Sequence, residues 1–311
     1  MAGSTRASAT ADPATADPVE ESWIEEPWAE EPWAEEPLRS RRRLPKLVRS
    51  RSGILALGVT LAILLVAFLA DLIAPYDPLL PVGPSLSPPS SEFLMGTDDL
   101  GRDLFSGVVH GTRTSTIIAL GVGGLALVIG TLVGTLAGYR GGAVDDVLMR
   151  ITEFFQVLPR FFVAILAVAL FGAGLDRLVL VLGFTSWAIL ARVVRAEVLS
   201  LRGRGFVESA VALGASDLHI LRRAILPNAM PPLIVFLTLL LGQVLLLEAS
   251  LGFLGLSDPN AISWGYLANQ AQRFLRIAWW MWLFPGAAIM VAVLALNLLG
   301  DALTRDTSGR A

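Results

Sequence analysis

Six long apolar runs constrain this 311-residue chain more than any other feature of its sequence. Each run holds roughly 18 to 23 residues, and about 20 apolar residues in a helix cross the hydrocarbon core of a bilayer. Hydrophobic residues make up 54% of the chain and charged residues only 16%, which excludes an ordinary soluble globule. We therefore predict an all-α membrane protein with six transmembrane helices. The runs are Gly53–Ala74, Ser115–Ala137, Phe154–Phe171, Leu178–Leu199, Pro231–Leu251 and Trp279–Leu299.

The distribution of charge predicts how these helices are oriented. A basic cluster from Arg39 to Arg51 stands directly before the first apolar run, and such clusters stay in the cytoplasm. Six crossings then return the C-terminus to the cytoplasm. This alternation leaves the acidic connection Ala74–Arg113 outside and the arginine-containing connection Leu199–Asn228 inside, as the same rule requires. We interpret the basic cluster as a topology signal beside a lipid bilayer and expect no nucleic acid as a partner.

The first 37 residues differ from the rest of the chain in composition. They are rich in alanine, glutamate and proline, and the sequence EEPWA begins at Glu25 and again at Glu30. Proline and repulsion between like charges predict a disordered segment, either a solvated tail or a tail that binds a partner. We divide the chain into an acidic disordered cytoplasmic tail (1–45), the first transmembrane helix with an external segment (46–112), and a transmembrane domain (113–305) that contains the cytoplasmic loop 199–228.

Several kinds of function lack the residues they require. The chain has no cysteine, and His110 and His219 lack the spacing of zinc ligands, so a two-histidine site is the less favoured reading. The phosphate-binding motif G-x-x-x-x-G-K-[ST] is absent, so ATP would have to be bound by a partner. No acid, histidine or serine constellation stands at catalytic spacing. We expect no catalytic residue, cofactor or metal ion in this chain.

The connection Leu199–Asn228 is unusually polar for so apolar a chain. Its pattern predicts a short helix over Phe206–Leu213, a break at Gly214 and a second short helix over Leu218–Leu226. Pro227 would then start the next membrane helix. Two short helices hinged at a glycine form a compact projection that fits a groove on a partner.

The residues of this projection resemble the EAA loop of ABC-importer membrane subunits. That pattern reads E-A-A, three residues, G, nine residues and then I-x-L-P. Ser209 replaces the middle alanine, and Ala224 stands where isoleucine is usual, with small or apolar character kept at both positions. The matching residues are Glu208, Ala210, Gly214, Leu226 and Pro227. The resemblance implies that these positions, with Ser209, couple the chain to ATPase subunits.

Motifs outside the loop sharpen the resemblance over nearly all of Leu94–Arg305. They are similar to those of the C-type permease of dipeptide, oligopeptide and nickel importers. The motifs are MGTDDLGRD from Met95, GYRGG from Gly138, EASLGFLGL from Glu248, SWG from Ser263, AWW from Ala278, FPG from Phe284 and NLLGD from Asn297. The resemblance implies the type I ABC importer permease fold in the plasma membrane of a prokaryote.

Such permeases are implied to work in a complex. The implied partners are a second homologous permease subunit, two cytoplasmic ATP-binding subunits that hold ATP and magnesium, and an extracytoplasmic solute-binding protein. We expect this chain to form half of a translocation pathway for di- or oligopeptides. An importer of nickel or another small solute is the alternative, and a secondary transporter, a membrane enzyme and a non-transporting scaffold are less favoured.

Two charged residues fall inside predicted spans. Arg160 stands near the middle of the third run, where a cation is costly unless it faces water, an acid or the bundle interior. It either contacts the substrate path or reaches the cytoplasmic face or an acid. Glu248 stands toward the external end of the fifth run, where it either gates the outer mouth or is a hydrogen-bonded carboxylate that fixes the adjacent turn.

The external segment is rich in proline and predicts an ordered cover rather than a helix. Asp98, Asp99 and Asp103 could be cation ligands there. The glycines and Arg102 among them favour a capped turn with internal ion pairing instead.

Overall fold

The computed structural model describes residues 50–307, so the acidic tail and most of the basic cluster lie outside the described residues. Between residues 50 and 307 the chain forms helices, two isolated bridges and no strand. The elements are α1 (Arg51–Phe68), α2 (Ala70–Ile73), α3 (Leu104–Arg140), α4 (Gly142–Val157), α5 (Arg160–Phe171), α6 (Leu175–Arg202), α7 (Gly205–Ala212), α8 (Asp217–Ile220), η2 (Leu221–Ile225), α9 (Leu226–Phe253), α10 (Trp264–Ala271), η3 (Gln272–Phe274) and α11 (Trp279–Thr307). The prediction of an all-helical chain is confirmed for this region.

Five helices of the described region are long and apolar enough to cross a membrane, and a sixth crossing requires α4 and α5 to count together. The third predicted span, Phe154–Phe171, is therefore wrong as a single helix. Its chain bends by 76° between Val157 and Arg160. Pro159 explains the break, because proline has no N–H to donate and forces the preceding Leu158 out of helical geometry.

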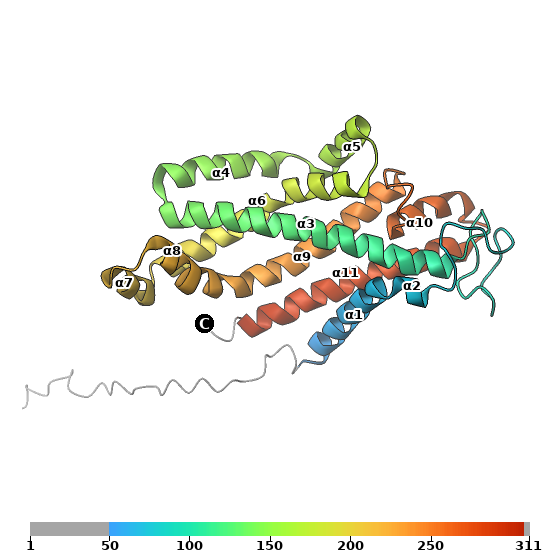
Figure 1. The fold of residues 1–311 in the computed structure, drawn as a ribbon, viewed down its shortest axis with the longest axis horizontal. Helices are drawn as coiled ribbons and strands as arrows, with labels where there is room; N and C mark the ends of the chain where they lie inside the picture. The colour runs from blue at the N-terminus through green and yellow to red at the C-terminus, as the bar shows by residue number, and fades with distance from the viewer. Residues whose placement is uncertain (1–49, 308–311) are drawn as a thin grey trace, which may run out of the picture. The chain divides into compact units, whose positions relative to one another are not determined.

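The centre of the described region is the parallel pair α3 and α6 (Figure 1). Glycines at Gly130, Gly134 and Gly138 repeat every fourth residue, so they share one face of α3. A Cβ atom at Gly130 would lie 2.7 Å from the Leu190 Cβ, and one at Gly138 would lie 2.9 Å from the Arg195 carbonyl oxygen. Small residues let the two backbones approach closely, as they do at many membrane helix interfaces.

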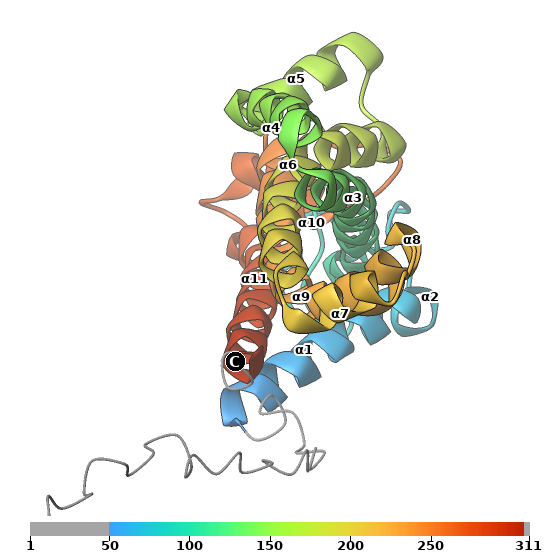
Figure 2. The same ribbon diagram turned by 90° about the vertical axis from the view of Figure 1, so that its left-hand side faces the viewer.

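The remaining helices flank this pair. Both ribbon views place α4 and α5 on one side of α3 and α6, and α1 and α11 on the other (Figures 1 and 2). The start of α1, the end of α11 and the short helices α7 and α8 lie toward one end of the bundle (Figure 1). The irregular segment before α3 and the helix α10 lie at the opposite end.

Arg113 holds the end of the first helix against α3. Its guanidinium donates to the Ala67 carbonyl oxygen at 3.0 Å and makes two hydrogen bonds, of 2.9 and 2.8 Å, to the Asp71 carboxylate. The predicted first span Gly53–Ala74 accordingly divides at Leu69 into α1 and α2.

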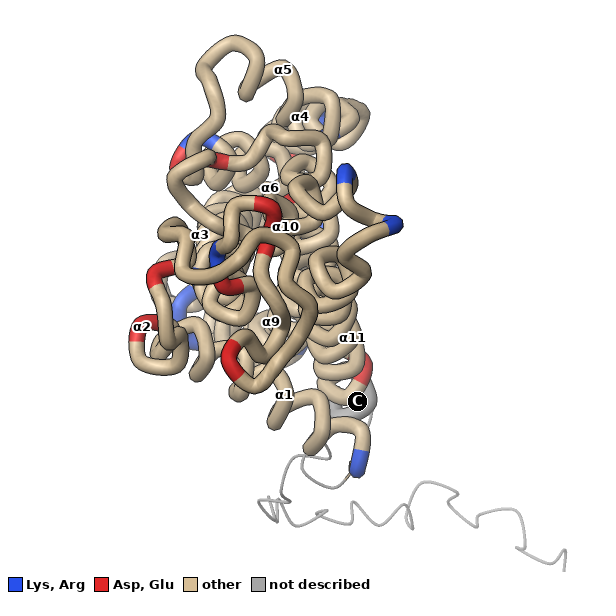
Figure 3. The backbone as a smooth tube through the Cα atoms, turned by 90° about the vertical axis from the view of Figure 1, so that its right-hand side faces the viewer, with Lys and Arg blue, Asp and Glu red and all other residues tan. Residues whose placement is uncertain are grey.

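The segment between α2 and α3 is irregular but well bonded, as predicted for an ordered cover. Acidic positions are scattered over this end of the molecule (Figure 3). The Asp98 carboxylate accepts a bond from the Arg102 Nε at 2.6 Å, and Asp103 caps α3 by accepting from the Ser106 N–H at 2.8 Å. Trp280 of α11 donates from its indole to the Thr97 carbonyl oxygen at 3.0 Å. A capped turn with an internal ion pair is therefore confirmed for Asp98 and Asp103.

Candidate functional site

The polar loop between α6 and α9 folds as a helix, a glycine break and a second helix. Helix α7 spans Gly205–Ala212, one residue earlier than predicted. Gly214 then has a φ of +76°, a left-handed conformation that only glycine adopts without strain. The Ala215 N–H donates to the Ala210 carbonyl oxygen at 3.0 Å and closes the turn. The tight turn predicted at Gly214 is confirmed.

The second short helix differs from the prediction. Helix α8 begins at Asp217, widens into the single π-turn η2 and continues directly into α9 at Leu226, so Leu218–Leu226 is no separate helix. Pro227 is the second residue of α9 and follows directly after the π-turn η2. The fifth membrane helix therefore begins inside the loop rather than near Pro231, and α8, η2 and α9 form one continuous helical segment.

The loop has an inner and an outer face. Val207, Ile220 and Ile225 are at most 2% exposed and pack into the main hydrophobic core. On the outer face Leu213 is 88% exposed and Val211 is 57% exposed. Exposed apolar side chains surrounded by polar residues often mark a surface that binds another protein.

The six residues of the sequence motif divide between these faces. Glu208, Ser209, Gly214 and Pro227 are exposed, whereas Ala210 and Leu226 are half-buried. The two departures from the motif are satisfied within the loop. The Ser209 hydroxyl donates to the Gly205 carbonyl oxygen at 2.8 Å, and the half-buried Ala224 packs against the core.

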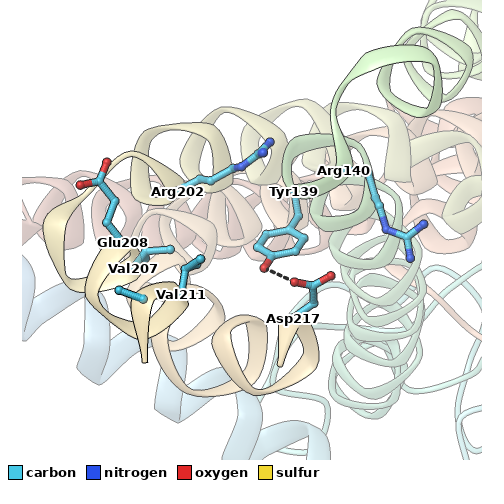
Figure 4. A pocket seen from close by; sticks show the side chains of 8 residues that line it. Tyr139, Arg140, Arg202, Val207, Glu208, Val211 and Asp217 are labelled. Atoms are coloured by element: carbon cyan, nitrogen blue, oxygen red, sulfur yellow. Dashed lines mark hydrogen bonds between the residues drawn. The ribbon is translucent and has the colours of Figure 1, made fainter. Parts of the chain in front are cut away.

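A pocket of about 580 Å³ separates the loop from the end of α3 (Figure 4). The Tyr139 hydroxyl donates to the Asp217 carboxylate at 2.8 Å, and the Arg202 guanidinium lies 5.9 Å from the centre of the Tyr139 ring. The Glu208 carboxylate points away from the Tyr139–Asp217 hydrogen bond (Figure 4). Sequence reasoning missed this contact. Tyr139 belongs to the GYRGG motif, but nothing in its spacing indicates that it meets residue 217.

Arg160 lies elsewhere in the structure. It is the first residue of α5, at the bend between α4 and α5, so it lies at a break between two helices rather than inside one continuous helix. Pro159 breaks the helix directly before it. It lines a second pocket, of about 430 Å³, together with residues of α6 and α9.

Glu248 lies near the opposite end of α9 from the loop and is 1% exposed. One of its carboxylate oxygens is 3.1 Å from the Ser115 Oγ of α3, and that Oγ also accepts the Trp264 N–H of α10 at 3.3 Å. The carboxylate thus connects α9 to α3 and, through Ser115, to α10. The structure therefore keeps the polar loop between α6 and α9, Arg160 and Glu248 in three separate places.

The described geometry and the sequence match one protein family. The model of the binding-protein-dependent transport system inner membrane component matches residues 130–307. This chain belongs to that family. As a family member it is a multi-pass permease subunit of a prokaryotic plasma membrane, and the family is one of transport subunits rather than enzymes.

Similar permeases occur in distant bacteria. The Di/tripeptide transport system permease protein DppC of Pseudomonas aeruginosa is 38% identical over 259 residues, which cover 80% of this chain and 86% of the relative. The Dipeptide transport system permease protein DppC of Bacillus subtilis is 37% identical over 250 residues, which cover 78% of each chain.

A solved structure shows the same fold at lower identity. A chain of the MetNI methionine ABC transporter in an inward-facing conformation aligns with a TM-score of 0.55 and 21% identity, over 65% of this permease and 96% of that chain. The likeness supports the helical arrangement of the permease core.

Proposed function

We propose that this permease forms half of the translocation pathway of an ATP-driven importer of di- or oligopeptides. The relatives that cover most of its length bear the names of di- and tripeptide permeases. An importer of nickel or another small solute is the alternative, and it has no support from those names. ATP and magnesium would be bound by partner subunits.

The observation that carries the coupling role is the two-faced loop α7–Gly214–α8. Its inner residues are locked into the core, and its outer face presents Phe206, Leu213 and Leu218 at 43%, 88% and 56% exposure. A rigid projection with an apolar outer face fits a groove on a cytoplasmic ATPase. Because α8 continues into α9, a displacement of the loop would move a whole membrane helix.

The same proposal includes six crossings with both termini in the cytoplasm. When α4 and α5 are counted as one bent crossing, the chain crosses the membrane six times. An even number of crossings puts both termini on the same side of the membrane. Exposed arginines at Arg202, Arg204, Arg222 and Arg223 flank the loop, which favours the cytoplasmic side. The partners would be a second homologous permease, two ATPases and an extracytoplasmic binding protein, as the family's name implies for the last.

Reconstitution of the whole complex in proteoliposomes tests this proposal. We expect uptake of a radiolabelled dipeptide that requires ATP on the ATPase side and the binding protein on the other. Uptake of nickel but not peptide would favour the alternative cargo. Uptake that persists without ATP would contradict the importer mechanism and favour a secondary transporter.

A substitution at Gly214 tests the loop itself. Gly214→Leu should lower peptide uptake at least about tenfold, because a left-handed conformation costs a non-glycine residue about 1 to 2 kcal/mol and the added side chain obstructs docking. Gly58→Leu is the matched control, since Gly58 is exposed on α1 with open space around it. Normal ATPase assembly and normal uptake in Gly214→Leu would refute the coupling role.

A further inference from the structure

The bend between α4 and α5 opens a hollow that the coupling loop does not use. It has a volume of about 430 Å³, within the range of about 300 to 1,000 Å³ that is usual for small-ligand pockets. Its walls come from the α4–α5 bend, from α6 and from α9. The lining residues include Arg160, Phe161, Phe162, Ser186, Gln243 and Leu247.

Three polar side chains of this hollow lack partners among the described residues. Ser186 is 1% exposed, and its hydroxyl makes no hydrogen bond. Arg160 and Gln243 enter no hydrogen bond or ion pair with any side chain described between residues 50 and 304. Of the three, only Ser186 is buried, and buried polar groups are almost always paired, so its unpaired hydroxyl beside an unpaired guanidinium points to an absent acceptor.

The start of helix α5 contributes to the same hollow. No side chain caps this twelve-residue helix, and its first backbone bond is donated by the Val163 N–H to the Pro159 carbonyl oxygen at 3.1 Å. The N–H groups of Phe161 and Phe162 therefore remain free at the positive end of the helix dipole. Helix N-termini of this kind favour bound anions, including where a helix is interrupted within a membrane.

We infer that Arg160, Ser186 and the N-terminus of α5 form a binding site for the C-terminal carboxylate of a peptide in transit. This inference rests on the proposed function and names the part of the substrate that the permease contacts. A guanidinium and a hydroxyl donate to a carboxylate, whereas the positive charge of Arg160 and the lack of a carboxylate in the lining disfavour a bound cation.

The apolar wall fits the rest of such a substrate. Phe161, Phe162 and Leu247 face the hollow beside the donors. They would accommodate apolar side chains of varied size without selecting one sequence. Gln243 is exposed on α9 and supplies an amide that can bond to a peptide group.

A comparison of a peptide with its amide tests the site. In proteoliposomes that hold the whole complex, import of Ala-Phe is measured beside import of Ala-Phe amide, with each peptide at saturation of the binding protein. We expect the native complex to import the free acid faster. Arg160→Gln should lower import of the acid about tenfold, as expected for loss of one charge-assisted hydrogen bond, and leave import of the amide unchanged. Ser186→Ala should act in the same direction by about twofold to fivefold.

Two further variants keep the result interpretable. Arg150→Gln removes the same charge from an exposed position of α4 outside the hollow and should change neither import rate. Arg160→Lys keeps the charge and should retain part of the preference for the acid, which also covers the case in which Arg160→Gln does not assemble.

The outcomes separate the site from the function. If native complex imports peptides but Arg160→Gln and Arg160→Lys keep the full preference for the acid, the site is wrong. Equal losses for acid and amide would also overturn it. If Arg160→Gln lowers import of Ala-Glu amide as much as it lowers import of Ala-Phe, the site binds side-chain carboxylates as well. That result would overturn the assignment to the C-terminal carboxylate. If the native complex imports no peptide, the proposed function itself fails.

Discussion

Tyr139, at the end of α3, donates a 2.8 Å hydrogen bond to Asp217, the first residue of α8. The bond connects a central membrane helix to the loop proposed to meet the ATPases. Arg202 of α6 lies over the same ring, so three elements converge on one side chain. The position of the loop thus depends on α3 and α6 as well as on its own turn.

Removing the Tyr139 hydroxyl should loosen the loop without unfolding the protein. A hydrogen bond to a charged group is worth about 1.5 to 3 kcal/mol when buried and less at an exposed site. We expect Tyr139→Phe to reduce ATP-driven uptake by about threefold to tenfold while the complex still assembles. Uptake per ATP hydrolysed is the measurement, with Tyr76→Phe as control. An unchanged ratio would show that the bond does not position the loop.

The glycine face of α3 should be sensitive to the smallest added group. A Cβ at Gly134 would meet the Val194 Cβ at 2.7 Å and the Arg195 backbone nitrogen at 3.0 Å. Gly134→Ala should therefore destabilise the protein by about 1 to 3 kcal/mol through overpacking. The melting temperature in detergent measures this effect. Gly124→Ala is the control, because nothing lies within 4 Å of that position, and it should leave the melting temperature equal or slightly higher.

Two substitutions at Glu248 distinguish a structural role of its carboxylate from a role in gating the outer mouth. Its contact with Ser115 connects α9 to α3 in a site that is 1% exposed. Glu248→Ala should cost about 2 to 5 kcal/mol, because it leaves a cavity and an unpaired Ser115 hydroxyl. Glu248→Gln keeps the shape and an oxygen acceptor and should fold and transport normally. Normal assembly with ATP hydrolysis uncoupled from uptake in Glu248→Gln would instead favour the gate.

The buried pair of Asp98 and Arg102 should hold the external segment in place. Both residues are buried, at 3% and 6% exposure, and Arg102 also donates to the Gln270 side chain of α10 at 2.8 Å. Arg102→Ala leaves an uncompensated buried carboxylate, a change that typically costs about 3 to 5 kcal/mol. We expect faster protease cleavage within residues 74–103. The control Arg273→Ala changes an exposed residue, and this variant should be cleaved at the native rate. Equal cleavage rates for the two variants would show that the Asp98–Arg102 pair does not hold the external segment in place.

The sequence by itself determined the helical class, most of the spans and the position of the loop. Membrane helices are recognisable because each must be apolar over about 20 residues whatever it packs against. The turn at Gly214 could also be predicted from local sequence, because a chain that ends a helix in a tight turn needs a residue in the left-handed conformation. Asp103 as a helix cap follows from the same local chemistry.

Only the tertiary structure decided what those elements meet. The bend at Pro159 places Arg160 at the start of α5 rather than inside one continuous helix, beside Ser186 and Gln243 from helices distant in the sequence. The bond from Tyr139 to Asp217 spans 78 residues. Hydropathy and spacing record the environment of a residue along its own helix, whereas these contacts depend on how separate helices pack. A small-residue face such as Gly130–Gly138 indicates that a helix packs closely, but it does not say which residues of another helix it meets.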